Sequence, residues 1–86
     1  MKARIRLETI TDIGNFVVAV ASATSSKEKV YVTDGDRMCV NAKSFLGLIH
    51  AREFSKIYVE SEKDIYSRIR EWIVEEDSPV DEQYAV

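Results

Sequence analysis

The sequence predicts an α+β open-faced sandwich, in which three helices cover one face of a four-stranded, largely antiparallel sheet. Two runs, residues 2–8 and 54–60, alternate apolar and polar side chains as half-buried strands do. An Asp34-Gly35 pair separates two further apolar runs, which is typical of a hairpin. The stretches between these runs carry apolar residues at helical spacing. The predicted order is β-α-β-β-α-β-α, in one domain over residues 1–76.

The first strand is expected over residues 2–8. Ala3, Ile5 and Leu7 fall on one face of this strand. Its other face carries the charged residues Lys2, Arg4, Arg6 and Glu8. The strand therefore has one face in the core and one in water.

The first helix follows, with Thr11 or Asp12 as its N-terminal cap. The β-branched valines of this stretch would also suit a buried strand, but alanines at 19, 21 and 23 favour a helix. A polar loop is expected at residues 24–27. The residues that recur at helical spacing are Phe16, Val17, Val20, Ala21 and Thr24.

A hairpin joins residues 30–32 to residues 38–40, and a short helix over residues 43–50 follows it. Ser44 lies near the start of this helix, and Phe45 and Leu48 are expected in the core. Gly47 in its interior costs about 1 kcal/mol relative to alanine, so packing must hold the helix.

The last strand, residues 54–60, points Ile57 and Val59 inward. Ser61 and Asp64 form a capping-box-like start for the third helix. The core face of this helix is expected to carry Ile65, Ile69, Trp72 and Ile73. The Ser78-Pro79 pair then ends the structured region, and residues 77–86 are expected to form a mobile acidic tail.

Composition excludes several classes of function. With 86 residues the chain can build one core, and a net charge of -3 argues against nucleic acid as the main partner. Its one cysteine, Cys39, excludes an intrachain disulfide, is expected to be buried, and fits a reducing cytoplasm. Neither a signal peptide nor a membrane span is expected, because no apolar run is long enough.

No motif for a metal or cofactor is present in the sequence. Cys39 and His50 cannot supply the four ligands that a zinc site needs, and the glycines are isolated. His50, the only histidine, could accept a phosphoryl group or sense pH, although a surface histidine near a helix C-terminus is the simpler interpretation.

Residues 40–48 read VNAKSFLGL, and here the chain resembles the HPr family, the small phosphocarriers of the bacterial sugar phosphotransferase system. The resemblance implies a sheet of four strands carrying three helices. It also implies that Ser44, which caps the second helix in that family, is phosphorylated by an ATP-dependent kinase. The alternative is that Ser44 serves only as the N-terminal cap of this helix. Phosphate at a helix N-terminus is physically favourable. The implied partners are proteins, namely phosphotransferase enzymes, a serine kinase or a transcription regulator.

The chain departs from that family at the start of the first helix. HPr proteins carry an active-site histidine followed by an arginine there, whereas Ile13, Gly14 and Asn15 stand in the corresponding region. None of these side chains can form a phosphoramidate, so histidine-based phosphotransfer at this position is excluded. The sequence therefore predicts a non-catalytic regulatory or docking protein. A phosphocarrier that acts through a different site, or a fold reused for an unrelated purpose, remain as alternatives.

Leu46 and Ile49 are the expected docking residues, together with Lys43. Leu46 and Ile49 lie three positions apart and so share one face of the second helix, where the HPr family has an apolar docking patch. The alternative for both residues is core packing.

Overall fold

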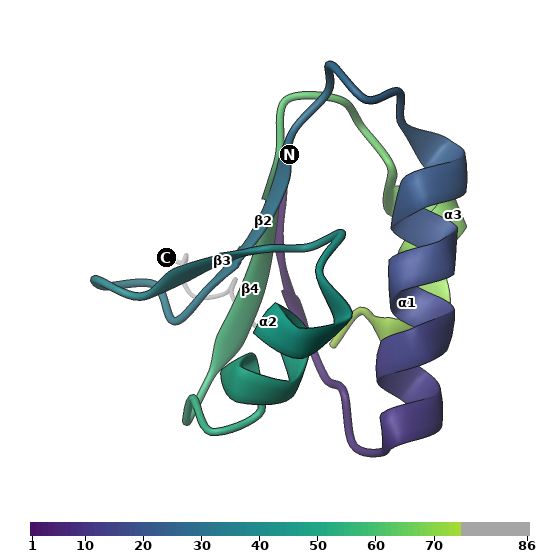
Figure 1. The fold of residues 1–86 in the computed structure, drawn as a ribbon. Helices are drawn as coiled ribbons and strands as arrows, with labels where there is room; N and C mark the ends of the chain where they lie inside the picture. Colours follow the sequence, from purple (N-terminus) through teal and green to yellow (C-terminus); the bar gives the residue numbers. More distant parts are fainter. Residues whose placement is uncertain (75–86) are drawn as a thin grey trace, which may run out of the picture.

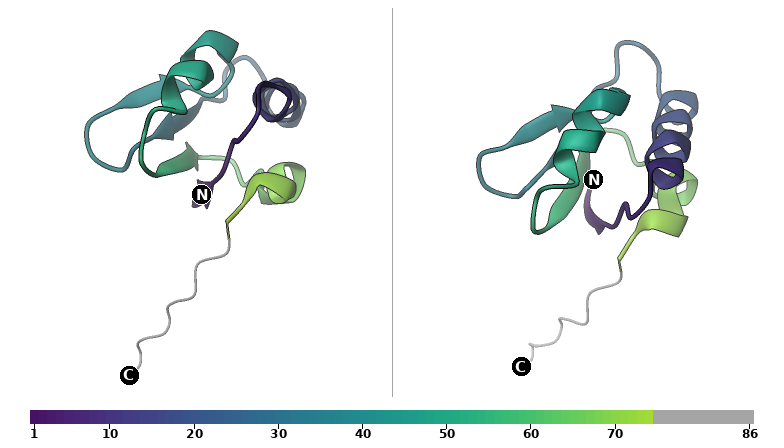
Figure 2. Two further views of the ribbon diagram at one scale, coloured as in Figure 1. Left: turned by 90° about the horizontal axis from the view of Figure 1, so that it is seen from below. Right: turned by 60° about the horizontal axis from the view of Figure 1, so that its bottom comes forward.

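The computed structural model describes residues 1–74 and shows four antiparallel strands with the helices on one side of the sheet (Figure 1). Two further views show the same layering, with the three helices together on one side (Figure 2). The expected α+β sandwich with a four-stranded antiparallel sheet is confirmed. Its elements are β1 (Lys2–Ile5), α1 (Ile10–Ala23), β2 (Val30–Thr33), β3 (Cys39–Asn41), α2 (Phe45–Ala51), β4 (Ile57–Ser61), α3 (Tyr66–Ile69) and a 3₁₀ turn (Arg70–Trp72).

The sheet has the strand order β1-β4-β2-β3, and each neighbouring pair is antiparallel. Val32 of β2 lies opposite both Val59 and Val40, which places apolar residues on the helix side. The neighbouring row of paired residues points to the open side of the sheet and consists of Arg4, Tyr58, Thr33 and Cys39. The register therefore divides the sheet into an apolar covered face and a polar open face.

The core lies between the sheet and the helices. Phe16 of α1 meets Trp72 edge to face, with ring centroids 5.4 Å apart. Ile65, Ile69 and Trp72 are buried, as the helical spacing predicts. Such a layer supplies most of the free energy that holds the short helices in place.

The first helix begins earlier than the sequence suggests. The Thr9 side chain accepts a hydrogen bond from the Asp12 N–H at 3.0 Å, and the Asp12 carboxylate accepts one from the Thr9 N–H at 3.2 Å. This reciprocal capping box makes Thr9 the cap, so the expected cap at Thr11 or Asp12 is wrong. The first strand is correspondingly shorter and ends at Ile5, although Leu7 is still buried.

The third helix is the largest departure from expectation. It ends at Ile69, and a 3₁₀ turn follows in place of a helix that continues to Ile73. Ile73 pairs with Ile5 as an isolated bridge, and the Arg6 N–H donates to the Trp72 carbonyl at 2.9 Å. Pairing with the edge of β1 therefore draws the chain out of helical geometry.

Ser61 does not cap the third helix, because it is the last residue of β4. Asp64 takes part of this role, since its carboxylate accepts a hydrogen bond from the Tyr66 N–H at 3.1 Å. The expected capping box of Ser61 and Asp64 is therefore wrong, because Ile65 is the N-terminal cap residue and its side chain makes no capping hydrogen bond.

Cys39 and Phe45 are exposed, and their expected burial is wrong. The register turns Cys39 to the open face of the sheet and leaves Val40 on the helix side. The expected acidic tail, residues 77–86, and the end of the expected domain, residues 75–76, lie outside the described residues. Within residues 1–74, none of the helices has the length and apolar character needed to cross a bilayer.

Candidate docking site on the first and second helices

Ser44 caps the second helix, as predicted. Its Oγ accepts a hydrogen bond from the Gly47 N–H at 3.0 Å, and its carbonyl accepts one from the Leu48 N–H, also at 3.0 Å. The Ser44 N–H donates to the Asn41 carbonyl at the end of β3. Ser44 therefore fixes both the start of α2 and its junction with the sheet.

Gly47 has a packing role that the sequence alone did not show. A Cβ at this position would lie 3.3 Å from the Ser44 Oγ and 3.4 Å from the Val40 Cβ. Any larger residue at this position would crowd the cap and β3, so glycine suits the close approach of the first turn of α2.

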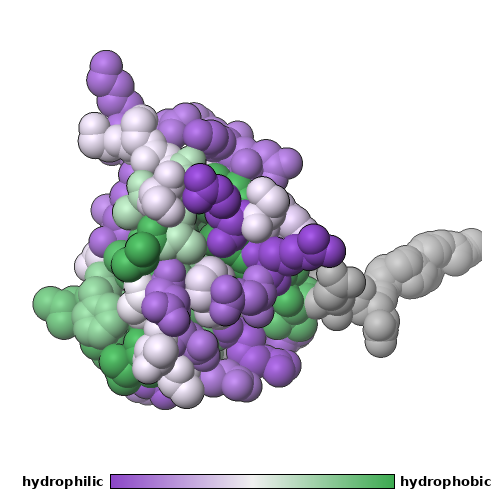
Figure 3. Space-filling model, turned by 90° about the vertical axis from the view of Figure 1, so that its right-hand side faces the viewer, coloured by the Kyte–Doolittle hydropathy of each residue, from purple (hydrophilic) through white to green (hydrophobic). Residues whose placement is uncertain are grey.

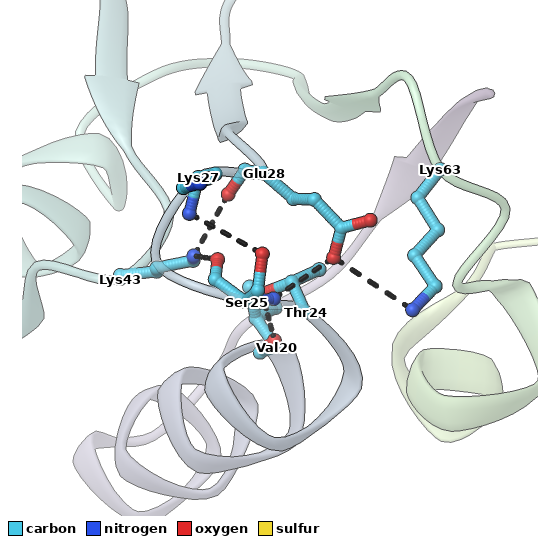
Figure 4. A network of polar contacts seen from close by, with 7 residues as sticks. All are labelled: Val20, Thr24, Ser25, Lys27, Glu28, Lys43 and Lys63. Atoms are coloured by element: carbon cyan, nitrogen blue, oxygen red, sulfur yellow. Dashed lines mark hydrogen bonds and ion pairs between the residues drawn. The ribbon is translucent and has the colours of Figure 1, made fainter.

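Lys43 is held by the loop that follows α1 (Figure 4). Its Nζ donates to the Ser25 carbonyl at 2.7 Å and to the Glu28 carbonyl at 2.8 Å. Glu28 in turn accepts from the Ser25 N–H at 2.8 Å and lies 3.7 Å from the Lys63 ammonium. The hydrogen bond from the Ser25 N–H and, after it, the charge of Lys63 lower the pKa of Glu28. The Lys43 ammonium thus joins the loop to the start of α2.

Four exposed apolar side chains lie on α1 and α2. Leu46 is 77% exposed, Val18 66%, Ile10 50% and Phe45 39%. Ile10, Gly14 and Val18 follow one another at four-residue intervals and so form one stripe of α1. A Cβ at Gly14 would lie 3.9 Å from the Phe45 ring, which places Phe45 beside this stripe. We name Ile10, Val18, Phe45 and Leu46 the α1–α2 apolar patch.

Figure 3 shows the face that carries α1, where hydrophobic side chains gather mainly toward one edge and hydrophilic ones cover most of the rest. Monomeric proteins rarely group exposed apolar residues in this way without using them, whereas single exposed leucines are common. The grouping, and not any one residue, marks the candidate site.

The expected docking pair is only partly brought together. Leu46 is the most exposed large apolar residue in residues 1–74, but Ile49 is half-buried and packs against the core. Sequence reasoning missed Ile10, Val18 and Phe45. The four-residue spacing of Ile10, Gly14 and Val18 is visible in the sequence. Ile10 was missed because the helix was expected to start only at Thr11 or Asp12.

Residues 13–15 do not form the loop at the start of the first helix. They lie within α1, where Ile13 is buried, Gly14 faces Phe45 and Asn15 is exposed. The helix start lies instead at Thr9, and the residues around it, 8–12, include neither histidine nor arginine. The expected location of the helix start at residues 13–15 is therefore wrong. The helix start at Thr9 also carries no histidine that could act as a nucleophile.

His50 lies in the last turn of α2 and is exposed. Its ring meets that of Phe54 edge to face, with centroids 6.0 Å apart. Within the part of the chain that the structure describes, no three His, Cys, Asp or Glu side chains are grouped so that they could hold a metal ion.

No protein-family model, curated protein or solved structure matches this chain. The function of the protein is therefore inferred from the geometry of residues 1–74 and from the resemblance of residues 40–48.

Proposed function

We propose that this protein is an HPr-like regulatory protein of the bacterial cytoplasm that docks onto partner proteins through the α1–α2 apolar patch and performs no catalysis itself. The observation that carries the proposal is that two adjacent helices expose large apolar side chains, Ile10 and Val18 on α1 and Phe45 and Leu46 on α2, with Phe45 beside the α1 stripe. The partners are phosphotransferase enzymes, a serine kinase or a transcription regulator.

Burial of the exposed side chains of this patch would contribute binding energy. Complete burial of a leucine or phenylalanine side chain contributes about 1.5–3 kcal/mol. A few such anchors commonly supply most of the binding energy of an interface. Leu46, with 77% of its surface free, has the most to gain from burial.

Ser44 is the proposed regulatory site, because it lies between Lys43 and the exposed Phe45 and Leu46. A phosphate would bring about 1.5–2 negative charges to this position. The Lys43 ammonium is already bonded to two loop carbonyls, so neutralising this charge falls to the partner. Phosphorylation would therefore weaken the binding of partners with an apolar docking surface. It would strengthen the binding of partners that present arginine.

Intact mass after two parallel incubations tests the switch. One sample receives ATP and an HPr-type serine kinase, and the other receives phosphoenolpyruvate and the upstream phosphotransferase enzyme. We expect one phosphate in the first sample, absent from Ser44→Ala, and none in the second. The matched control is Ser22→Ala, which alters an exposed serine on α1.

A second candidate function is favoured by the exposed ring of His50. Imidazole is the nucleophile of phosphocarriers, so an accessible histidine could carry a phosphoryl group by a different route. Phosphate gained in the second sample and lost in His50→Gln would replace the regulatory proposal with this one.

A further inference from the structure

A pocket opens at one end of the open face of the sheet. Its volume of about 720 Å³ falls within the range of about 300–1,000 Å³ that small-molecule sites usually have. The helices and the α1–α2 apolar patch lie on the other side of the sheet, so this pocket is separate from the proposed docking site (Figure 1). We name it the open-face pocket, and its lining includes Lys2, Lys27, Lys29, Tyr31, Glu60 and Glu62.

The register of the strands builds the inner row of this pocket. Tyr31 of β2 lies opposite Glu60 of β4, and Glu60 lies opposite Lys2 of β1. Their neighbours Val32 and Val59 are buried beneath the helices, so alternation turns this row to the open face. The Lys2 ammonium lies 3.4 Å from the Glu60 carboxylate. The row therefore presents the Tyr31 ring, which is 38% exposed, beside an ion pair that is already formed.

The outer row of the pocket carries opposite charges that do not meet. The pairing of Val30 with Ser61, continued by one residue, places Lys29 opposite Glu62. Lys27 lines the same pocket from the loop that joins α1 to β2 (Figure 4). Within residues 1–74, the side chains of Lys27, Lys29 and Glu62 form no ion pair. This part of the chain therefore presents two ammonium groups and one carboxylate to a ligand in the pocket.

The two rows together suit a zwitterion that carries an aromatic ring. Side chains on one face of a strand follow one another at about 6.6 Å, which is close to the reach of an aromatic amino acid from its α-carboxylate to its ring. A purely anionic ligand would face the Glu62 carboxylate, and a purely cationic ligand would face the two lysines. A ligand with both charges avoids either repulsion, and its ring can pack against Tyr31.

We propose that the open-face pocket binds one free aromatic amino acid. Lys27 and Lys29 bind the α-carboxylate, and Glu62 accepts hydrogen bonds from the α-ammonium group. The aromatic side chain of the ligand packs against the Tyr31 ring. A residue within a peptide chain lacks at least one of the two charges, so the ligand is a free small molecule and not a segment of a partner protein.

Titration of the full chain, followed by NMR signals of the backbone at residues 27–31 and 60–62, tests this assignment. The probe is L-tryptophan, with three analogues: L-leucine lacks the aromatic ring, tryptamine lacks the carboxylate and indole-3-propionate lacks the ammonium group. We expect L-tryptophan to bind at least about fivefold more tightly than each analogue, with shifts confined to the pocket. Every sample contains residues 75–86, so the measured affinities include any effect of that segment.

The variants change exposed side chains, so the fold is expected to survive. Tyr31→Leu should weaken the binding of L-tryptophan about fivefold, whereas Tyr66→Leu, which changes an exposed tyrosine on α3, should leave it unchanged. Glu62→Gln should abolish the preference for L-tryptophan over indole-3-propionate, and Glu53→Gln, which removes an exposed carboxylate after α2, should retain it. Equal binding of L-tryptophan and its analogues, shifts spread over the whole chain, or equal losses in the two tyrosine variants would overturn the proposal.

Discussion

Gly47 and Ser44 are packed so closely that a methyl group on Gly47 would lie 3.3 Å from the Ser44 hydroxyl, which accepts its hydrogen bond from the Gly47 N–H. The cap and the glycine therefore depend on each other. Cap, glycine and the neighbouring Phe45 and Leu46 form one local unit at the start of α2.

Gly47→Ala is expected to lower the free energy of unfolding by about 0.5–1 kcal/mol, because crowding of Ser44 and Val40 outweighs the gain of about 1 kcal/mol in helix propensity. Urea unfolding measures this change. A higher free energy of unfolding for Gly47→Ala would show that the contacts with Ser44 and Val40 tolerate the added methyl group. Gly14→Ala is the comparison, since its Cβ would make only an ordinary contact with Phe45, and it should stabilise.

Ser44→Ala is expected to cost about 1 kcal/mol of stability, because the Gly47 N–H loses its acceptor. Ser44→Asp should retain most of the stability, since aspartate is as good a cap as serine. Thermal unfolding of the two variants checks the difference. Equal losses in both would mean that the side-chain hydrogen bond contributes nothing.

Lys43→Met is expected to destabilise the protein by about 1.5–3 kcal/mol, because two carbonyls lose bonds from a charged donor. The loss should appear first as faster hydrogen exchange in the loop of residues 24–29, which these bonds hold. Lys56→Met, which removes an exposed lysine outside this network, should leave the exchange of the loop unchanged.

Asp12 makes stability sensitive to acid. Hydrogen bonds from the Glu8 N–H and then the Thr9 N–H lower the pKa of Asp12 from 3.8. The unfolded chain therefore takes up the proton first, so this contribution is complete above about pH 4 and disappears as the pH falls through the lower folded pKa. Urea unfolding at a series of pH values below 5 should show a shallower decline for Asp12→Asn than for the unaltered protein. Identical pH profiles would contradict this role of the capping box.

Features that depend on residues close together in the sequence were predicted correctly, whereas features that depend on residues far apart in the sequence were not. Alternation placed Ile57 and Val59 in the core correctly, and the expected hairpin forms around the Asp34-Gly35 pair, with a positive φ at Gly35. These features depend on neighbours in the chain. Ile73 was misplaced because its partner, Ile5, lies far away in sequence and the edge of β1 competes with the helix.

The candidate site was predictable only in part, for the same reason. Ser44 was found because a cap is a local signal. Exposure of Phe45 and Val18 depends on how α1 and α2 meet, and helical spacing alone cannot show this. Cys39 was placed in the core on residue type, but strand register decides which face it occupies.

The docking claim is tested most directly by partner capture with three forms of the full chain. These are the unaltered protein, Leu46→Gln, and Tyr31→Gln, which changes an exposed residue on the open face of the sheet. Captured proteins are identified by mass spectrometry, and their affinities are then measured with purified components. We predict that Leu46→Gln weakens binding about tenfold or more, while Tyr31→Gln binds like the unaltered protein. Undiminished binding by Leu46→Gln, or equal losses in both variants, would contradict docking through the α1–α2 apolar patch.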